Sequence, residues 1–179
     1  MAFHIKIENV VASITLNVPV QLDKLVTTLE SIEYEPEQFP GLVLRLKNPK
    51  AAILIFSSGK LVCTGAKSPK DTNIAVAKVV TMIRKAGIKV PREYTVQVEN
   101  IVASARLERE LNLDTIAFEL ENAEYEPEQF PGLVYRMDDP KVAFLLFGSG
   151  KIVCTGGRTI ADVNRAVEKL DKKLKSMGS

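Results

Sequence analysis

The eleven residues EYEPEQFPGLV occur twice in this chain, at Glu33–Val43 and again, unchanged, at Glu124–Val134, 91 positions later. Shifting the sequence by that distance aligns residues 5–88 with residues 96–179 without a gap, and roughly 40 of the 84 pairs are identical. A solenoid unit is shorter, typically about 20–50 residues, and a solenoid usually needs three or more of them. The sequence therefore predicts two copies of one unit of about 85 residues.

The boundaries of the two units follow from the same alignment. We expect residues 1–88 to form the first repeat, residues 89–95 a linker and residues 96–179 the second repeat, the whole being one intimately joined domain. Around the joint, in AGIKVPRE, Gly87 suits the end of a helix and Pro91 prevents the helix from continuing.

Composition and charge are those of an ordinary soluble protein of 179 residues, with 46% hydrophobic residues, 26% charged residues and a formal net charge of +2. No apolar run approaches the roughly 18–20 residues that cross a membrane, and MAFHIKIENV lacks the anatomy of a signal peptide. The chain is therefore expected to stay inside the cell. In that reducing compartment we expect Cys63 and Cys154, at equivalent repeat positions, to be two separate buried thiols.

The apolar periods within each unit predict one strand, one helix, three or four strands and a second helix. His4–Leu16 alternates like a strand, and Leu22, Leu25, Val26 and Leu29 fall on one helical face. Three β-like runs follow, at 42–46, 51–56 and 60–64, before the closing helix. The predicted class is α+β with an antiparallel sheet.

Side-chain alternation along these strands predicts two unlike sheet faces. One set, such as Val10, Ala12 and Ile14, is wholly apolar and is expected to face the helices. The other set is also largely apolar, although two helices per repeat can hardly cover both faces. We considered three occupants of the second face: a dimer partner or the other half, an apolar small molecule, or a nucleic acid. The net charge of +2 scarcely separates them.

Three doubled motifs, EQFPGLV(L/Y)R, FxSGKxVCTG and ENxVAS, resemble the TATA-box-binding protein family over essentially the whole chain. The chain looks closest to the archaeal-type members, which lack a long variable tail before the core. The resemblance implies a pseudo-twofold saddle of two β-α-β(4)-α repeats, in which a curved ten-stranded antiparallel sheet carries four helices on its convex face. The concave face would sit on the DNA minor groove. The family is itself the standard example of minor-groove binding with apolar wedges, and the resemblance implies such wedges here.

The resemblance also assigns the DNA-contacting residues. Intercalating wedges would be Phe39 with Phe56 and Phe130 with Phe147. Asn9, Asn100, Thr64 and Thr155 would hydrogen-bond base edges near the centre of the element, where the minor groove offers adenine N3 and thymine O2. Sugars and base edges would pack against the apolar residues Val11, Val102, Leu54, Leu145, Val62 and Val153, and the phosphates would be contacted by Arg45, Arg136, Lys60 and Lys151.

The two units differ in charge, because residues 5–88 have a net charge of +4 and residues 96–179 a net charge of −3. In the family, the second repeat contacts transcription factor B, which here maps to Glu126 and Glu128. The expected partners are therefore TATA-element DNA, transcription factor B and the RNA polymerase pre-initiation complex, with no membrane. The apolar face also leaves open a homodimer of the DNA-free protein. The expected location is the archaeal cytoplasm, with the nucleoid, or the nucleus for a eukaryotic source.

An enzyme is not expected, because the single histidine, His4, lies near the chain start and no nucleophile–base arrangement is visible. Two distant cysteines and one histidine give no metal spacing, so we expect neither a metal nor a cofactor. The alternative to a general transcription initiation factor is a pseudo-symmetric module that binds a protein or an apolar ligand on the same sheet face.

Overall fold

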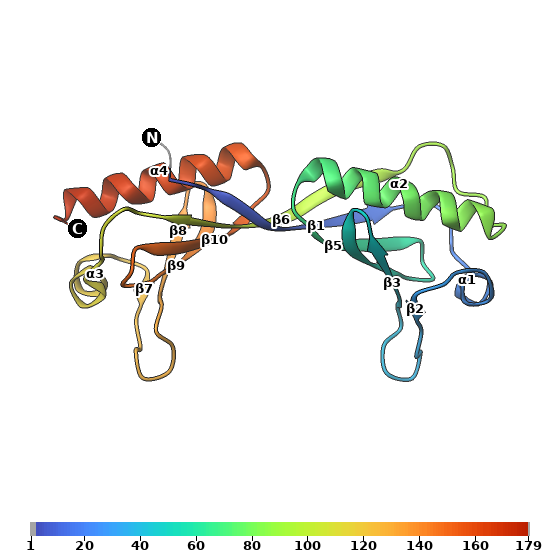
Figure 1. Cartoon of the computed structure of the whole chain (residues 1–179), viewed down its shortest axis with the longest axis horizontal. Helices are drawn as coiled ribbons and strands as arrows, with labels where there is room; N and C mark the ends of the chain where they lie inside the picture. Colours follow the sequence, from blue (N-terminus) through green and yellow to red (C-terminus); the bar gives the residue numbers. More distant parts are fainter. Residues whose placement is uncertain (1–2, 179) are drawn as a thin grey trace. The chain divides into compact units, whose positions relative to one another are not determined.

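The computed structural model describes residues 3–178 and contains two successive sets of elements with the same order, a strand, a helix, four strands and a helix (Figure 1). The first set is β1 (Lys6–Thr15), α1 (Leu22–Thr28), β2 (Ile32–Glu33), β3 (Leu42–Lys47), β4 (Lys50–Ile55), β5 (Lys60–Ala66) and α2 (Pro69–Lys85). The second set is β6 (Thr95–Arg106), α3 (Leu113–Glu119), β7 (Ala123–Glu124), β8 (Leu133–Asp138), β9 (Lys141–Leu146), β10 (Lys151–Gly157) and α4 (Ile160–Ser176). The predicted repeat of one strand, one helix, four strands and one helix is confirmed.

The strands pair in an antiparallel manner, and their hydrogen-bonded order is β2-β3-β4-β5-β1-β6-β10-β9-β8-β7. Contacts divide the chain into two compact units. One unit comprises residues 9–99, and the other comprises residues 100–179 with the start of the chain up to Glu8. In the second of these, the Arg106 amide donates to the Phe3 carbonyl (3.1 Å) and the Ser104 hydroxyl donates to the Glu8 carboxylate (2.6 Å).

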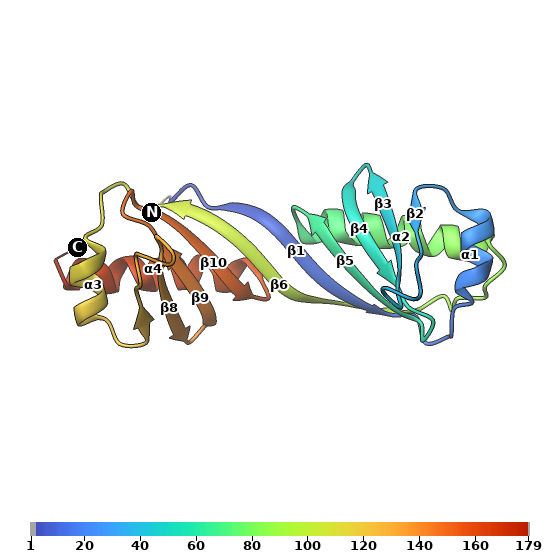
Figure 2. The same ribbon diagram turned by 90° about the horizontal axis from the view of Figure 1, so that it is seen from below.

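In the unit of residues 9–99, the strand residues of one parity form the core with both helices. Leu22 and Leu25 of α1 and Val76, Val79 and Ile83 of α2 belong to the same buried cluster as the sheet residues Leu42, Leu44, Ile53, Ile55, Leu61 and Cys63. Figure 2 shows α2 lying across β3, β4 and β5 on that side of the sheet. The predicted apolar parity is confirmed. Val26 is an exception, because it is 42% exposed, near the end of a helix of only seven residues.

The second unit repeats this arrangement with its own side chains. Buried residues of its sheet include Leu133, Tyr135, Phe144, Leu146, Ile152 and Cys154. Tyr135 stacks on Phe144 with ring centroids 6.3 Å apart, and Lys173 of α4 lies over the Tyr135 ring at 5.9 Å. The large apolar side chains buried on α4 are Val163, Val167, Leu170 and Leu174, spaced three or four residues apart as on one helical face.

The long helices begin and end where their residue types favour it. The side chains of Ser68 and Thr159 cap α2 and α4 by accepting hydrogen bonds of 3.0 Å from the amides of Asp71 and Asp162. Gly87, with φ 98°, follows α2, as expected from its place at the joint. Cys63 and Cys154 are buried, unpaired thiols, which confirms that prediction.

Candidate nucleic-acid interface

In each unit, the sheet face opposite the core presents a row of apolar side chains across four strands. In the first unit, Val43, Leu54, Val62 and Ser13 are successive cross-strand partners on β3, β4, β5 and β1. All four are half-buried, and none of them belongs to the buried cluster that the sheet forms with the helices. We call this surface the open face of the first unit; it also contains Val11 of β1.

The second unit has an open face with the same residues. Val134, Leu145, Val153 and Ser104 are cross-strand partners on β8, β9, β10 and β6, and Val102 lies beside them on β6. Each is half-buried. Half-buried valine and leucine in a cross-strand row form a flat apolar strip that can pack against another flat surface.

A pair of phenylalanines lies beside each open face. Phe39 and Phe56 pack edge to face with ring centroids 5.8 Å apart and an interplanar angle of 66°. Phe130 and Phe147 repeat this with 6.0 Å and 66°. Phe39 and Phe130 are 41% and 42% exposed, so both rings remain accessible although each packs against another ring. The structure therefore brings together the members of each predicted wedge pair.

Backbone turns hold these rings in place. The Phe39 amide donates to the Glu35 carbonyl (2.9 Å), and the Phe56 amide donates to the Lys60 carbonyl (3.0 Å) across the SSGK turn. Gly41 lies under the ring pair, since a Cβ there would be 2.7 Å from Phe39 Cε2 and 2.9 Å from Phe56 Cε1. Gly132 occupies the same place, since a Cβ there would be 2.7 Å from Phe130 Cε2 and 3.0 Å from Phe147 Cε1. The absence of a side chain at these two positions makes room for the rings.

The four predicted polar residues form one pair in each unit. Asn9 Nδ2 donates to Thr64 Oγ1 (3.1 Å), and Asn9 Oδ1 accepts from the Gly65 amide (2.6 Å). Asn100 makes the same bonds to Thr155 and Gly156. Because a backbone amide only donates, it fixes the carboxamide with its oxygen inward. The second hydrogen on Nδ2 is then left for an external acceptor.

The predicted phosphate contacts are exposed cations at the margins of the open faces. Lys60 and Lys151 lie in the SGK turns. Arg45 is the register partner of Ala52, which pairs in turn with Thr64, and it forms an ion pair with Glu33 (2.6 Å). Arg136 has the equivalent register, opposite Ala143, which pairs with Thr155, but it makes no ion pair within residues 3–178. The structure thus distinguishes two arginines that the sequence treats as equivalent.

The two acidic residues mapped to a protein partner lie on an exposed turn of the second unit. The Glu126 backbone carbonyl accepts from the amides of Gln129 (2.9 Å) and Phe130 (3.0 Å), and the side chains of Glu126 and Glu128 are exposed. Both carboxylates are therefore presented to solvent from an ordered turn.

Sequence reasoning did not single out several residues of the open faces. These are Ser13, Val43 and Ala52 in the first unit and Ser104, Val134 and Ala143 in the second. The signal was available, because each has the same strand parity as a predicted contact residue.

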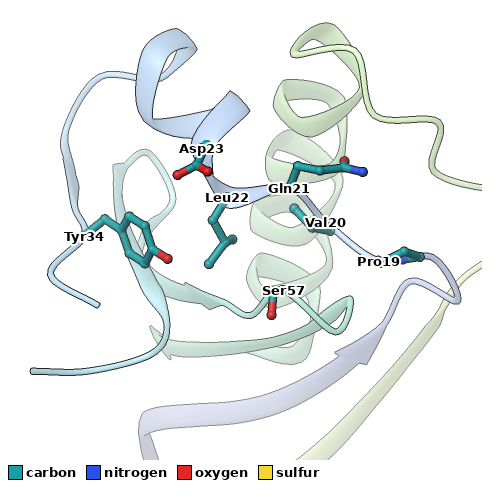
Figure 3. Close-up of a pocket in the computed structure, with 7 residues that line it drawn as sticks. All are labelled: Pro19, Val20, Gln21, Leu22, Asp23, Tyr34 and Ser57. Carbon is teal, nitrogen blue, oxygen red and sulfur yellow. The ribbon is translucent and has the colours of Figure 1, made fainter. Parts of the chain in front are cut away.

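Two hollows lie away from the open faces. One, of about 400 Å³, is lined by Pro19, Val20, Gln21, Leu22, Asp23, Tyr34 and Ser57 around the start of α1 (Figure 3). The other, of about 430 Å³, is lined mainly by charged residues between β8 and α4, including Arg136, Asp139, Lys169 and Lys173. Within residues 3–178 no group of three or more His, Cys, Asp or Glu side chains is placed to hold a metal ion. The same described residues include no helix that is long and apolar enough to cross a membrane.

Two matched sheet units, each with an apolar open face and an aromatic pair, define a two-repeat protein of the α+β class. The family described as "Transcription factor TFIID (or TATA-binding protein, TBP)" matches residues 4–86 and 95–177, once for each repeat. The chain belongs to this family. The predicted resemblance, including its archaeal type, is confirmed.

Individual relatives agree with this assignment over nearly the full chain. The TATA-box-binding protein of Methanobrevibacter smithii is 54% identical, covering 97% of this chain and 96% of its own. That of Methanothermobacter thermautotrophicus is 55% identical, covering 95% and 94%. Among solved structures, Methanococcus jannaschii TBP matches with a TM-score of 0.90 and 52% identity, covering 96% of this chain and 98% of that one. The predicted fold class is confirmed, and the family is one of transcription factors rather than enzymes.

Proposed function

We propose that this chain is a general transcription initiation factor that binds the minor groove of a TATA element through its two open faces. The observation that carries the proposal is the apolar row with an exposed, edge-to-face phenylalanine pair, present once in each unit. The relatives named TATA-box-binding protein support it.

The open faces have the chemistry that the minor groove of A·T pairs requires. Adenine N3 and thymine O2 are acceptors, and the remaining Nδ2 hydrogens of Asn9 and Asn100 are donors aimed away from the protein's own bonds. Valine and leucine beside them can lie against sugars and base edges but offer nothing to the guanine amino group. A G·C pair would leave that amino group unpaired against the apolar row. Preference for A·T pairs follows.

The phenylalanine pairs would act as wedges. A ring inserted at a base step replaces part of the lost stacking, and pyrimidine–purine steps such as TA open most easily. Phe39 and Phe130, each about two-fifths exposed, are the leading rings, and Phe56 and Phe147 support them from behind. The two pairs would kink the duplex at two places.

Exposed lysine and arginine side chains would bind the phosphates of the DNA backbone. Lys60, Lys151 and Arg136 can reach phosphates without breaking an ion pair within residues 3–178, whereas Arg45 must first leave Glu33. Each phosphate neutralised should contribute about 0.9 to the slope of log K against log salt. Each repeat has one arginine and one lysine among the predicted phosphate contacts. The first repeat should nevertheless contribute less to that slope than the second, because Arg45 is already paired with Glu33.

Recruitment of transcription factor B and RNA polymerase would use the second unit. Exposed Glu126 and Glu128 suit a basic surface, and the excess negative charge of residues 96–179 favours the same partner. Charge reversal to Glu126→Arg with Glu128→Arg should weaken the ternary complex on DNA at least tenfold and leave binary DNA binding intact. The same reversal at Glu35 and Glu37 is the matched control, and an unaffected ternary complex would refute this part of the proposal.

The decisive test of DNA binding compares two labelled duplexes by fluorescence anisotropy, one with a TATA element and one with G·C pairs in its place. We expect clear preference for the TATA duplex. Equal and weak binding to both would instead favour a protein-binding or apolar-ligand module on the same faces.

The wedges are tested by energy transfer between dyes at the two duplex ends. Phe39→Ala and Phe130→Ala should each reduce bending, and the double variant should reduce it further. Thr27→Ala, at an exposed position of α1, controls for the substitution itself. Normal bending in both single variants would reject the wedge assignment.

A further inference from the structure

Phe118 on α3 is the most exposed large apolar side chain of the described residues, at 92%. The other exposed large hydrophobic residues reach only about 40%, namely Val26, Phe39, Ile74, Phe130 and Ile160. A phenylalanine left almost fully in water gains nothing for folding, since its burial is what would stabilise the chain. Its place on the surface therefore calls for a use outside the unit.

The helix turns Phe118 directly away from the core. Leu113, Ile116 and Leu120 are the buried positions of α3 and its C-cap, and they define one face. At 100° per residue, Phe118 lies opposite the centre of that face, with Asp114 one turn before it on the same side. The ring thus lies on the outer surface of α3, whose place in the second unit is labelled in Figure 1.

Three exposed carboxylates lie in or just before α3. Asp114 and Glu119 belong to α3, and Glu110 lies just before it; all three are exposed and make no ion pair within residues 3–178. The nearby Arg109 is turned inward, with its Nη2 2.9 Å from the buried Asp171. We call Glu110, Asp114, Phe118 and Glu119 the α3 patch.

The equivalent surface of the first repeat lacks these features. Thr27 and Thr28 stand in place of Phe118 and Glu119, Pro19 in place of Glu110, and Lys24 in place of Thr115. The α1 surface therefore has neither the exposed ring nor the uncompensated charge. The difference lies outside the open faces, whose residues are the same in both repeats.

We propose that the α3 patch is a docking site for a basic protein segment with one large apolar side chain. The apolar side chain would pack on Phe118, and flanking lysine or arginine residues would pair with Asp114, Glu119 and Glu110. Aromatic residues in such settings are the usual hot spots, and a cation over the ring adds to the attraction. This site is separate from Glu126 and Glu128 and does not depend on DNA binding.

The test uses a short peptide of alternating arginine and leucine, N-acetylated and C-amidated, titrated into ¹⁵N-labelled full-length protein. Backbone amides of α3 should shift, and substituting serine for leucine in the peptide should weaken the response. Phe118→Thr should raise the dissociation constant measured at α3 about tenfold or more. The variant should fold, because threonine already occupies this position in the first repeat.

The first repeat supplies the reverse experiment. Lys24→Thr with Thr27→Phe and Thr28→Glu should create peptide-dependent shifts on α1, where the parent protein shows none. The proposal would be overturned if Phe118→Thr left the dissociation constant at α3 unchanged, or if the α1 variant showed no peptide-dependent shifts. It would also be overturned if the wild-type protein did not bind the peptide but self-associated through Phe118, because a second copy would then be the occupant. TATA-duplex anisotropy of the same variants should be unchanged, so failure of the patch and failure of DNA binding are distinguishable.

Discussion

Gly41 and Gly132 show how the absence of a side chain at one position leaves room for the phenylalanine pair beside it. Neither glycine has a positive φ, so another residue could adopt its backbone conformation. What the position excludes is the Cβ itself, which would lie 2.7 Å from the leading phenylalanine ring. The contact is with the outer end of a half-exposed side chain, so the ring can move away.

We therefore predict that Gly41→Ala and Gly132→Ala displace the wedges more than they destabilise the fold. The free energy of unfolding should fall by about 1 kcal/mol or less, because the rings can shift into solvent. DNA bending measured by energy transfer should fall clearly. Gly148→Ala is the matched control, since its Cβ would meet only the Leu111 carbonyl oxygen at 3.8 Å. Unchanged bending in both alanine variants would contradict this role.

The two thiols give a second prediction at this scale. Burial raises the pKa of Cys63 to about 11 and that of Cys154 to about 12, so almost no thiolate is present near neutral pH. Both should react with a thiol reagent at pH 8 far more slowly in the folded protein than in denaturant. Measuring the release of the coloured thiolate from such a reagent over time tests this, and rapid stoichiometric reaction of the native protein would contradict it.

Single residues also show where sequence reasoning ends. The alternation of side chains along the strands was enough to predict that Asn9 and Leu54 lie on the sheet face opposite the helices. It could not indicate that Gly65 fixes the Asn9 carboxamide, because that bond joins residues 56 positions apart. The difference between Arg45 and Arg136 likewise depends on side-chain conformations that the identical motifs do not encode.

At the scale of elements, α4 contains a buried charge that its counterpart α2 lacks. Asp171 is 1% exposed and pairs with Arg109 (2.9 Å) and Lys175 (3.0 Å). Nε of Arg109 is buried without a hydrogen-bond partner among the described residues. In the first repeat, Val80 and Val18 occupy the places of Asp171 and Arg109, and both pack in the apolar core. Two equivalent positions, one on the long helix and one before the short helix, thus hold an ion pair in one unit and two valines in the other.

We predict that this ion pair makes the stability of the second unit decrease at acidic pH. Burial alone would raise the pKa of Asp171, but hydrogen bonds from Lys175 and Arg109, with their charges, lower it. A lowered pKa in the folded state means a contribution that is complete above the unfolded value of about 3.9 and is lost as the pH falls from there through the lower folded-state pKa. Hydrogen exchange of α4 amides, followed as the pH is lowered from about 5 to about 2, should therefore show earlier loss of protection than that of α2 amides.

Variants that copy the first repeat provide the control. Asp171→Val alone leaves Arg109 partly buried without its partner and should cost roughly 2–4 kcal/mol, less than a fully buried pair because Arg109 is 29% exposed. Adding Arg109→Val should recover most of that loss and reduce the acid sensitivity of α4. A double variant as unstable as the single one would show that the pair is not the cause.

Most of the helices and strands were predictable from the spacing of apolar residues along the sequence. Strands and the two 17-residue helices have apolar spacings long enough to be read, and their buried faces agree with them. The seven-residue helices were less so. Their pattern covers under two turns, which explains why Val26 was expected inside and why Phe118 was not recognised as an exposed residue.

At the scale of the whole molecule, the two repeats combine identical contact residues with different charges. Every predicted DNA-contacting residue of the first repeat has the same residue type at its counterpart in the second. The added members of the open faces, Ser13, Val43 and Ala52, also have identical counterparts. The net charges of +4 and −3, by contrast, arise from residues outside the open faces and the wedges, such as those of the α3 patch. We therefore expect direction on DNA to come mainly from partners rather than from the predicted contacts with bases.

This division predicts how the protein should orient on a TATA element that is not palindromic. A donor dye attached at Ser149→Cys and an acceptor at one duplex end should report two populations of similar size, because exchanging the repeats exchanges identical contacts. The native thiols should not compete for the label, since both are buried with raised pKa values. Ser58→Cys, the counterpart position, should give the same two populations in mirrored proportion. Addition of transcription factor B should then favour one population, because only the second repeat combines the acidic turn with an excess of negative charge. A single dominant orientation of the protein alone would place the source of direction in the few side chains that differ near the phosphates, and would contradict the equivalence of the two open faces.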